Sequence, residues 1–384
     1  MAESTNYDVV VIGAGVFGSW TAWHLAHRGQ KVLVLEAYGA AHARASSGGE
    51  TRIIRMSYGK DEIYTRWSHR SLSQWKELSA ASGQQLFEQT GVLWMEGDDI
   101  GRLRDSQETL QCCGIRHEVM DHAALAKRYP QVNFEGVTRG LLEPDSGVLM
   151  ARRGVLTVIE EARNKGVEFR IARVVTPKGQ GPRATISTAS GENISADHFV
   201  FTCGPWLAKV FPELLGSRIF PTRQEVFFFG TPAGDSRFGS DALPTWLFNN
   251  DEVYGMPDIE SRGLKLALDT HGPSADPDTQ SRIVSADGAE WARNYVARRF
   301  PALKGAPITE TRVCQYENTS NGDFLIDRHP DMPNVWLAGG GSGHGFKHGP
   351  AFGEHLAGLV CGEQKAEPRF SLASKSTQKA RTVH

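Results

Sequence analysis

The feature that most constrains this 384-residue chain is the order of elements in its first thirty-six residues. An apolar, β-branched run at Tyr7–Ile12 leads directly into Gly13–Gly18, which spells G-x-G-x-x-G. A helical pattern follows and ends near Gly29, where a C-cap belongs, and a second apolar run at Lys31–Leu35 ends in Glu36. Strand, glycine turn, helix, strand and acid in this order are typical of a βαβ unit that binds a dinucleotide.

Each position of this turn has a physical role in that interpretation. Gly13 permits a tight turn, Gly15 lets the backbone approach a pyrophosphate, and Gly18 lets the helix pack closely on the strand. The helix N-terminus presents free amides and the positive end of its dipole. We therefore predict an adenine dinucleotide here, the alternative being an ordinary glycine-rich turn. The predicted contacts are Gly13, Gly15, Val16, Phe17, Gly18 and Glu36, the last binding a ribose.

Composition excludes several classes of protein. The formal net charge is −2 and no long basic run occurs, which argues against a nucleic-acid partner. No apolar stretch approaches the roughly 20 residues that span a bilayer. We therefore expect no membrane association. We also expect no metal, because the cysteines lack metal-ligand spacing.

Cellular location is predicted from the cysteines and the two ends of the chain. Five cysteines, an odd number, suit a reducing cytosol. The polar start at Met1–Asn6 does not read as a signal peptide, and the end at Arg381–His384 is not a Ser-Lys-Leu address. We predict a cytoplasmic protein whose polar tail after Pro368 is loosely held.

A loop of small residues with two serines, Ser46 and Ser47, precedes a segment that carries two arginines. Thr51 opens this segment, and helical spacing would place Arg52 and Arg55 on neighbouring faces. The arginines could be solvated at the surface, or they could lie beside a ligand because isoleucines and a glycine loop flank them. The residues alone leave both possibilities open.

The middle of the chain contains elements of two kinds. Helices are expected at 63–78, 100–112, 153–165 and 289–299, and a turn at 141–149 separates short strands. A buried strand at 198–202 ends in Cys203, Gly204 and Trp206, as in a sheet that presents a loop to a cofactor at its carboxyl edge.

Residues 218–313 show a strand-like, aromatic period of two, which predicts a second, largely antiparallel sheet over the cofactor. Lys265 lies in the middle of one apolar strand, Leu264–Leu268. A buried lysine is rare unless it is paired or functional, so the alternative is that the pleat points it to solvent.

A second glycine-rich turn follows the strand Val335–Ala338 near the end of the chain. It contains Gly341, Gly343, His344, Gly345, Phe346 and Lys347 and leads into a helix. Two such turns in one chain favour FAD over a nicotinamide cofactor, because FAD spreads its groups over two crossovers.

These patterns predict an α/β fold, with a Rossmann-like FAD-binding domain and an α+β domain built on an antiparallel sheet. The FAD-binding domain is predicted to be discontinuous, from residues 1–86, 146–217 and 315–384. Residues 87–145 and 218–314 are expected to form the substrate domain.

The chain resembles the monomeric sarcosine oxidase family, which includes N-methyltryptophan oxidase and pipecolate oxidase and belongs to the D-amino-acid oxidase superfamily. The resemblance extends from Tyr7 to about Gly362. Its most specific motifs are Glu50–Arg55 with Ser57–Gly59, Val313–Tyr316, Phe324–Pro330 and Gly343–Lys347.

The resemblance implies roles for particular residues. Cys314 matches the cysteine that attaches FAD through a thioether, and Arg52 and Lys347 match the pair that binds the substrate carboxylate. Lys265 matches a lysine that activates dioxygen near the flavin, through a water, and Arg55 an arginine beside the flavin. Tyr254 and Tyr316 match tyrosines of the substrate cavity.

One position departs from the family pattern. Sarcosine oxidases have a histidine four residues after the lysine, where this chain has Asp269. A carboxylate there would attract a cationic substrate group or accept a proton, which makes sarcosine itself uncertain as the substrate.

The resemblance implies an FAD-dependent amine oxidase that converts a secondary, N-methyl or cyclic, amino acid to an imine and reduces dioxygen to hydrogen peroxide. The expected partners are the small amine and dioxygen, and we expect a monomer. The alternatives are a flavin dehydrogenase with another electron acceptor, an oxidase of cyclic imines or of glycated amino acids, and a non-enzymatic flavoprotein.

Overall fold

The strand that precedes the first glycine turn lies in the interior of a seven-stranded sheet. The computed structural model describes residues 6–99 and 101–377 and gives the strand order β17-β18-β11-β1-β2-β9, with β10 paired to β11. The pairs that involve β1 are parallel, as the continuous apolar run at Tyr7–Ile12 indicates. The strands are β1 (Tyr7–Ile12), β2 (Val32–Glu36), β9 (Glu168–Ile171), β10 (Thr185–Ser187), β11 (Asn193–Phe201), β17 (Leu325–His329) and β18 (Met332–Gly339).

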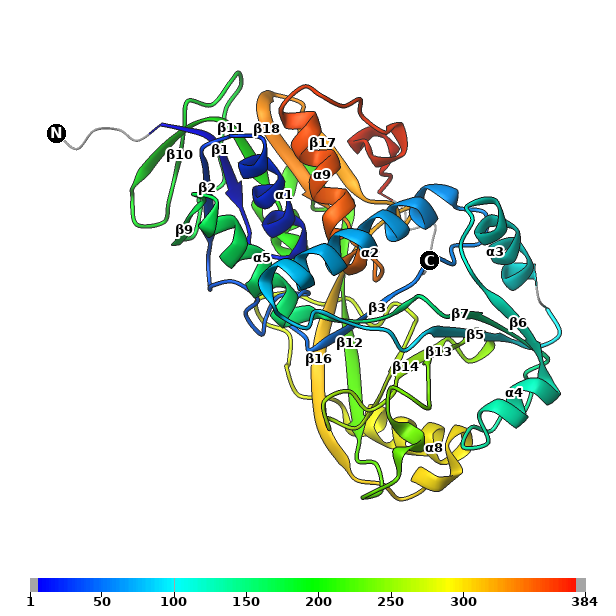
Figure 1. Cartoon of the computed structure of the whole chain (residues 1–384). Coiled ribbons are helices and arrows are strands. Elements are labelled where there is room, and N and C mark those ends of the chain that lie inside the picture. Colours follow the sequence, from blue (N-terminus) through cyan, green and yellow to red (C-terminus); the bar gives the residue numbers. More distant parts are fainter. Residues whose placement is uncertain (1–5, 100, 378–384) are drawn as a thin grey trace.

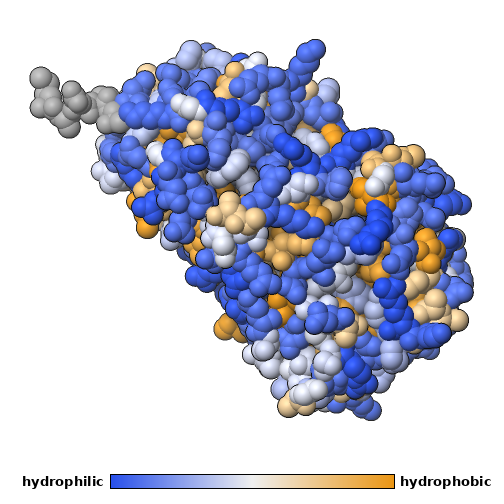
Figure 2. All heavy atoms as spheres, in the orientation of Figure 1, coloured by the Kyte–Doolittle hydropathy of each residue, from blue (hydrophilic) through white to orange (hydrophobic). Residues whose placement is uncertain are grey.

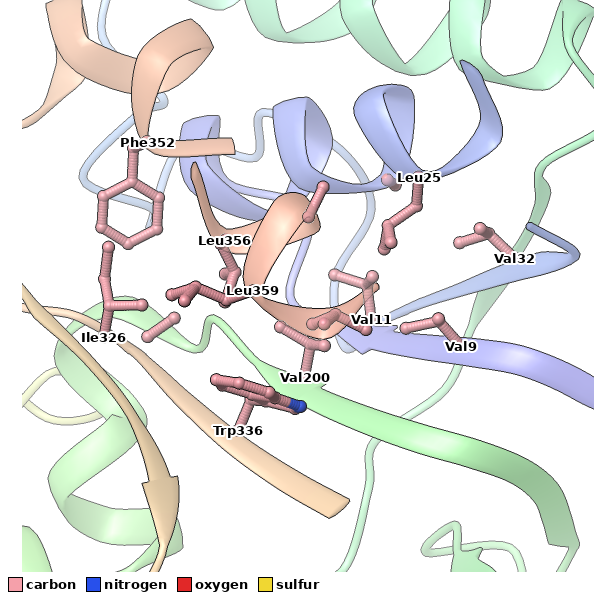
Figure 3. Close-up of a cluster of buried hydrophobic side chains, with 14 of the residues drawn as sticks. Val9, Val11, Leu25, Val32, Val200, Ile326, Trp336, Phe352, Leu356 and Leu359 are labelled. Carbon is pink, nitrogen blue, oxygen red and sulfur yellow. The ribbon is translucent and has the colours of Figure 1, made fainter. Parts of the chain in front are cut away.

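Helices α1 (Val16–His27), α5 (Ala151–Asn164) and α9 (Gly349–Val360) pack together beside this sheet (Figure 1). In Figure 3, Val9, Val11 and Val200 project from the strands toward Leu25 of α1 and Leu356 of α9. The side chains of this cluster are buried, so the sheet and its helices share one apolar core.

An eight-stranded sheet forms the other half of the molecule, in the order β16-β12-β15-β14-β13-β5-β7-β6. Every neighbouring pair is antiparallel except β13 with β5, so the predicted largely antiparallel sheet is confirmed. Its strands are β5 (Val92–Glu96), β6 (Glu118–Asp121), β7 (Arg139–Glu143), β12 (Ile219–Phe229), β13 (Thr245–Phe248), β14 (Val253–Met256), β15 (Leu264–Leu268) and β16 (Ile308–Thr319).

The aromatic residues of this second sheet form its core. Phe227, Phe229, Trp246 and Phe248 are buried with residues of helix α8 (Ala286–Arg299). The predicted α/β fold is confirmed, whereas the domain boundaries given above remain a prediction.

A three-stranded sheet, β3-β8-β4, corrects one expectation. The segment with the two arginines is a strand, β3 (Thr51–Ile54), and not a helix. Its β-branched residues favour this pairing over the helix that a three-residue spacing suggested. The partner strands are β8 (Gly147–Met150) and β4 (Phe87–Glu88).

The helices expected in the middle of the chain are present, and the elements not yet given complete the chain. They are α2 (Glu62–Ser82), α3 (Gly101–Cys112), α4 (His122–Arg128), α6 (Leu207–Val210), α7 (Pro212–Leu215), and the 3₁₀ turns η1 (Gly204–Trp206), η2 (Ser236–Phe238), η3 (Asn249–Asp251), η4 (Pro301–Leu303), η5 (Phe346–His348), η6 (Pro368–Phe370) and η7 (Leu372–Ser374).

The expectation of a loose tail after Pro368 is wrong for the described residues. The Phe370 ring is fully buried, and the Arg369 guanidinium binds Asp61 at 2.6 Å and Asp323 at 2.7 Å. One buried aromatic ring and two ion pairs hold this polar segment without a periodic apolar face. The predicted targeting features at 1–5 and 381–384 lie outside the described residues.

The face of the molecule in Figure 2 is mainly hydrophilic, with apolar side chains interspersed. Within residues 6–99 and 101–377, none of the helices combines the length and apolar character that crossing a bilayer requires.

We predict that Gly353→Ala destabilises the protein, because an added Cβ would lie 2.6 Å from the Trp20 carbonyl carbon of α1. The cost should be about 1–3 kcal/mol, the usual range for overpacking. Gly358→Ala on the same helix is the matched control, since its Cβ would meet the flexible Gln364 side chain. Denaturant unfolding measures both, and equal stabilities of the two variants would contradict the close packing of α1 and α9.

Candidate active site

A cavity of about 590 Å³ lies where the two glycine-rich turns meet the second sheet. Glu36 and Tyr38 line one part of it, and Tyr254, Asp269 and Tyr316 line another. Cofactor sites commonly have volumes of about 300–1,000 Å³, so the cavity is large enough for a sizeable ligand.

The first glycine turn has the shape that pyrophosphate binding requires. Gly13 has a positive φ of 108°, and a Cβ on Gly18 would lie 1.9 Å from the Gly13 carbonyl oxygen. Gly15 caps helix α1 without a side-chain hydrogen bond, and the Val16 amide donates to Ser47 Oγ at 3.1 Å. The start of α1 therefore faces the cavity with backbone groups.

Glu36 is fixed at the end of β2 by the backbone around it. Its Oε2 accepts a hydrogen bond from the Ala14 amide at 2.8 Å, and its Oε1 accepts one from the Tyr38 amide at 3.0 Å. The carboxylate is thus oriented beside the turn with lone pairs left for a ribose.

The second glycine turn, after β18, touches both the first turn and the second sheet. A Cβ on Gly345 would lie 2.7 Å from the Phe17 ring of α1, and one on Gly343 would lie 2.9 Å from the Tyr316 ring. Glycine is needed at both positions because neighbouring groups approach the backbone directly. The two turns therefore form one continuous cradle, which fits an extended dinucleotide such as FAD.

Cys314 and Arg52 lie together on the cavity wall. An Arg52 amino group is 3.4 Å from Cys314 Sγ and also donates to the Ser46 carbonyl at 2.7 Å. The thiol and the guanidinium therefore face the same part of the cavity.

Arg55 and Lys347 form a second pair of cations on the wall. Both lie over the Tyr58 ring, with Arg55 Cζ 4.2 Å and Lys347 Nζ 5.2 Å from its centroid. Their side chains are buried, 5% and 4% exposed. Burial lowers the pKa of Lys347 far below its ordinary value, and the Arg55 charge lowers it further.

Lys265 is buried, 3% exposed, which excludes the reading that its strand points it to solvent. Its Nζ donates to the Thr51 carbonyl at 2.8 Å and to the Thr51 hydroxyl at 3.1 Å. Burial lowers its pKa well below the ordinary value, and the Arg52 charge adds to that effect. The lysine lies behind Thr51 and is not itself part of the cavity wall.

Asp269 is the acid that faces these cations. Burial raises its pKa to about 6, although the positive charges of Arg55, Arg102 and Lys347 oppose the shift. A carboxyl with a pKa near neutrality can take or release a proton at the working pH of an enzyme.

Most of the residues predicted from the sequence share this cavity. Those on its wall are Gly13, Gly15, Val16, Phe17, Glu36, Ser46, Ser47, Arg52, Arg55, Cys203, Gly204, Trp206, Tyr254, Asp269, Cys314, Tyr316, Gly341, Gly343, His344, Gly345, Phe346 and Lys347. Gly18, Thr51 and Lys265 support the wall from behind. The individual roles given to these residues remain predictions.

Two residues of the site were missed as candidates. Tyr58 joins the cations to His344 and His348, whose ring nitrogens lie 3.2 and 2.7 Å from its hydroxyl. Glu317 is a buried acid on the cavity wall. A strand pattern shows which residues share a face, but it does not show that a ligand lies beside the opposite face.

A family model described as "FAD dependent oxidoreductase" matches residues 8–359, nearly the whole chain. The chain therefore belongs to the FAD-dependent oxidoreductase family, and FAD is its cofactor.

The chain is 31% identical to human peroxisomal sarcosine oxidase, covering 97% of this chain and 96% of that protein. It is also 31% identical to monomeric sarcosine oxidase from Bacillus sp. strain NS-129, covering 93% of each. The predicted resemblance to the sarcosine oxidase family is confirmed. The structure of L-proline dehydrogenase from P. horikoshii superposes with a TM-score of 0.82 at 22% identity, covering 96% of this chain and 97% of that one, which shows the same fold.

We predict that Asp269→Asn raises the melting temperature of the holoprotein above about pH 6. The raised folded pKa means that ionising Asp269 costs stability, and the cost grows from about pH 3.8, the ordinary value, to about pH 6. The difference between variant and wild type should increase over that window and then stay constant.

Asp251→Asn provides a control of opposite sign. Burial alone would raise the pKa of Asp251, but hydrogen bonds from Arg299 and Tyr295 outweigh it and lower the pKa. This variant should be less stable than wild type at pH 6, and the deficit should shrink below about pH 3.8. The same response in both variants would contradict the opposite environments assigned to the two acids.

Proposed function

We propose that this enzyme oxidises the C–N bond of a secondary amino acid to an imine, with dioxygen as electron acceptor and hydrogen peroxide as product. The observation that carries the proposal is the pair of buried cations, Arg55 and Lys347, facing Asp269 in the FAD cavity. The similarity of the sequence to two sarcosine oxidases also supports the proposal.

The cavity wall supplies what such a substrate needs. Arg55 and Lys347 bind the carboxylate, since a guanidinium presents a planar fork and an ammonium adds a point charge. Tyr254 and Tyr316 cover the substrate and exclude water. Asp269 accepts the amine proton, so that the nitrogen is neutral when oxidation begins.

When bound, FAD supplies the two-electron chemistry that no side chain offers. The substrate loses two electrons and two protons, which reach dioxygen as hydrogen peroxide. Water then hydrolyses an acyclic imine to an amine and a carbonyl compound, whereas a cyclic imine can persist.

The geometry favours Arg55 over Arg52 as the partner of Lys347. Arg55 shares the Tyr58 ring with Lys347, and its charge acts most strongly on both Lys347 and Asp269. Arg52 instead contacts Cys314. We therefore propose that Arg55 binds the substrate carboxylate and that Arg52 lies beside the flavin, which exchanges the two roles inferred from the sequence.

Two further roles follow the family resemblance. Cys314 is proposed to hold FAD through a thioether, which its place on the cavity wall next to Arg52 supports. Lys265 is proposed to favour the reduction of dioxygen through its positive charge, because a preorganised cation stabilises a developing anion.

The protein is also proposed to act as a cytoplasmic monomer. The absence of disulfides among the five cysteines supports a reducing compartment.

The proposed reaction is tested with paired substrates and peroxide detection. N-methyl, cyclic and glycated amino acids should include substrates, and the matching amines without a carboxyl group should be far poorer. Arg55→Ala should raise KM for the best substrate by roughly tenfold to a hundredfold, the loss expected for a charge-assisted hydrogen-bonded contact worth about 1.5–3 kcal/mol. Arg52→Ala is the comparison variant, and a KM effect confined to Arg52 would restore the original assignment. Absence of peroxide with every secondary amine would refute the function.

The thioether is tested by acid precipitation of the purified protein. The wild-type pellet should stay yellow, and Cys314→Ala should release its colour into the supernatant. Cys203→Ala serves as the control because that thiol also lines the cavity. A yellow supernatant from the wild type would exclude a covalent link.

Replacing Lys265 separates an oxidase from a dehydrogenase. Lys265→Met should slow reoxidation by dioxygen by at least tenfold, in line with the loss of one preorganised electrostatic contact. Turnover with an artificial electron acceptor should fall much less, as stopped-flow measurement of the two half-reactions shows. Unchanged reoxidation by dioxygen would refute the role of Lys265.

A further inference from the structure

Glu317 is a buried carboxyl on the cavity wall that the proposed reaction does not use. It lies on β16, whose alternation places Cys314 and Tyr316 on one face and Glu317 on the other. The residue is 6% exposed, and within the described part of the chain its Oε1 has no hydrogen-bond partner. A buried polar atom left in this way is costly unless a ligand completes it.

The second glycine turn is built around this carboxyl group. A Cβ on Gly339 would lie 2.4 Å from Oε1, so a side chain at that position would displace the acid. Backbone hydrogen bonds from Gly340 and Gly341 act to lower the pKa of Glu317, yet burial outweighs them and raises it to about 8. Burial therefore favours the neutral acid, and Oε1 is the oxygen free to carry the proton.

The position of Glu317 indicates which part of the cofactor it faces. The Cys203 thiol, after β11, lies 3.6 Å from the Ile12 carbonyl oxygen beside the first glycine turn, and the charges of both Glu36 and Glu317 act on it. Glu36 marks the adenosine end of the cavity, and Cys314 on the same strand as Glu317 marks the proposed flavin end. A dinucleotide that spans these two ends would place its pyrophosphate and ribityl section beside Glu317. An ionised carboxylate at this place would be repelled by the phosphates.

We propose that Glu317 is a cofactor-binding residue that acts as a neutral carboxylic acid, donating a hydrogen bond from Oε1 to an oxygen of the ribityl–pyrophosphate section of FAD. The proposal rests on FAD as the cofactor of the family and is independent of the amine substrate and of the thioether.

The groups that immediately surround Glu317 do not change charge near pH 8. Burial also lowers the pKa values of Lys265, Lys347 and Lys375 elsewhere in the molecule, and the Glu317→Gln variant separates the ionisation of Glu317 from theirs. The Gly339–Gly341 turn and Pro221, its register partner on β12, carry no ionisable side chain. Burial raises the pKa of the Cys203 thiol, so that thiol stays neutral. His42, beside Glu36, has a pKa lowered by burial and is neutral before Glu317 ionises.

The test measures FAD affinity against pH in the Cys314→Ala background, in which the flavin is held without a covalent bond. Flavin is removed from the purified protein and FAD is titrated back between pH 6 and pH 10, with flavin fluorescence as the signal. The dissociation constant should be constant below about pH 8 and should then rise by up to roughly tenfold per pH unit, as expected when only the protonated form binds.

Glu317→Gln keeps the shape of the side chain and a donor at the same place but cannot ionise. Its dissociation constant should match that of the parent at pH 7 within about threefold and should stay nearly constant up to pH 10. In Cys203→Ser the dissociation constant for FAD should still rise above about pH 8, which assigns the effect to Glu317. Calorimetry in two buffers at pH 8.5 should show proton uptake on FAD binding by the parent and none by Glu317→Gln, and the parent data test the proposal even if a variant fails to fold.

Two results would overturn the proposal. An affinity that is flat or increases with pH in the parent would show that the ionised carboxylate binds FAD or that Glu317 makes no contact. Weakened binding by Glu317→Gln at pH 7 would show that the carboxylate accepts a hydrogen bond from the ribityl hydroxyls.

Discussion

The site depends on cationic side chains that are buried away from water around one cavity. Arg55, Lys265 and Lys347 are each 5% exposed or less, and Asp269 is the acid that faces Arg55 and Lys347. Desolvating a cation costs several kcal/mol, by order of magnitude, unless an anion or hydrogen-bond acceptors replace the water. Lys347 Nζ donates to the His344 carbonyl and Arg55 to the Ser57 carbonyl, and under the proposed function a bound carboxylate would add the anion and return the pKa of Lys347 toward its ordinary value. Under the proposed function, the cavity thus favours an anionic substrate before any substrate binds.

Each of the two sheets contributes a different part of this cavity. The parallel sheet places the glycine turns at the carboxyl ends of β1 and β18, where a dinucleotide binds. The antiparallel sheet contributes β14, β15 and β16, which bring in Tyr254, Lys265 and Cys314. The contact of Phe17 with Gly345 positions the second turn against the first, and the contact of Tyr316 with Gly343 positions it against the antiparallel sheet. Both halves of the molecule are thus needed for one site.

Local patterns in the sequence were sufficient for the fold class and for most of the cavity wall. The glycine turns, the buried strands and the family motifs each depend on neighbouring residues, and the structure bears them out. The spacing of Arg52 and Arg55 suggested a helix, but Arg52 lies in a strand. Its conformation is decided by pairing with β8, which is far along the chain. Glu317 and the pairing of Arg55 with Lys347 also depend on contacts between distant segments, which no local period records.

The central claim is that a secondary amino acid reduces the flavin in this cavity, and anaerobic titration of the holoprotein measures it most directly. Flavin absorbance should be bleached by an N-methyl or cyclic α-amino acid, and the corresponding amine without a carboxyl group should leave it oxidised. Failure of every secondary amino acid to bleach the flavin, or equal bleaching without the carboxylate, would contradict the account.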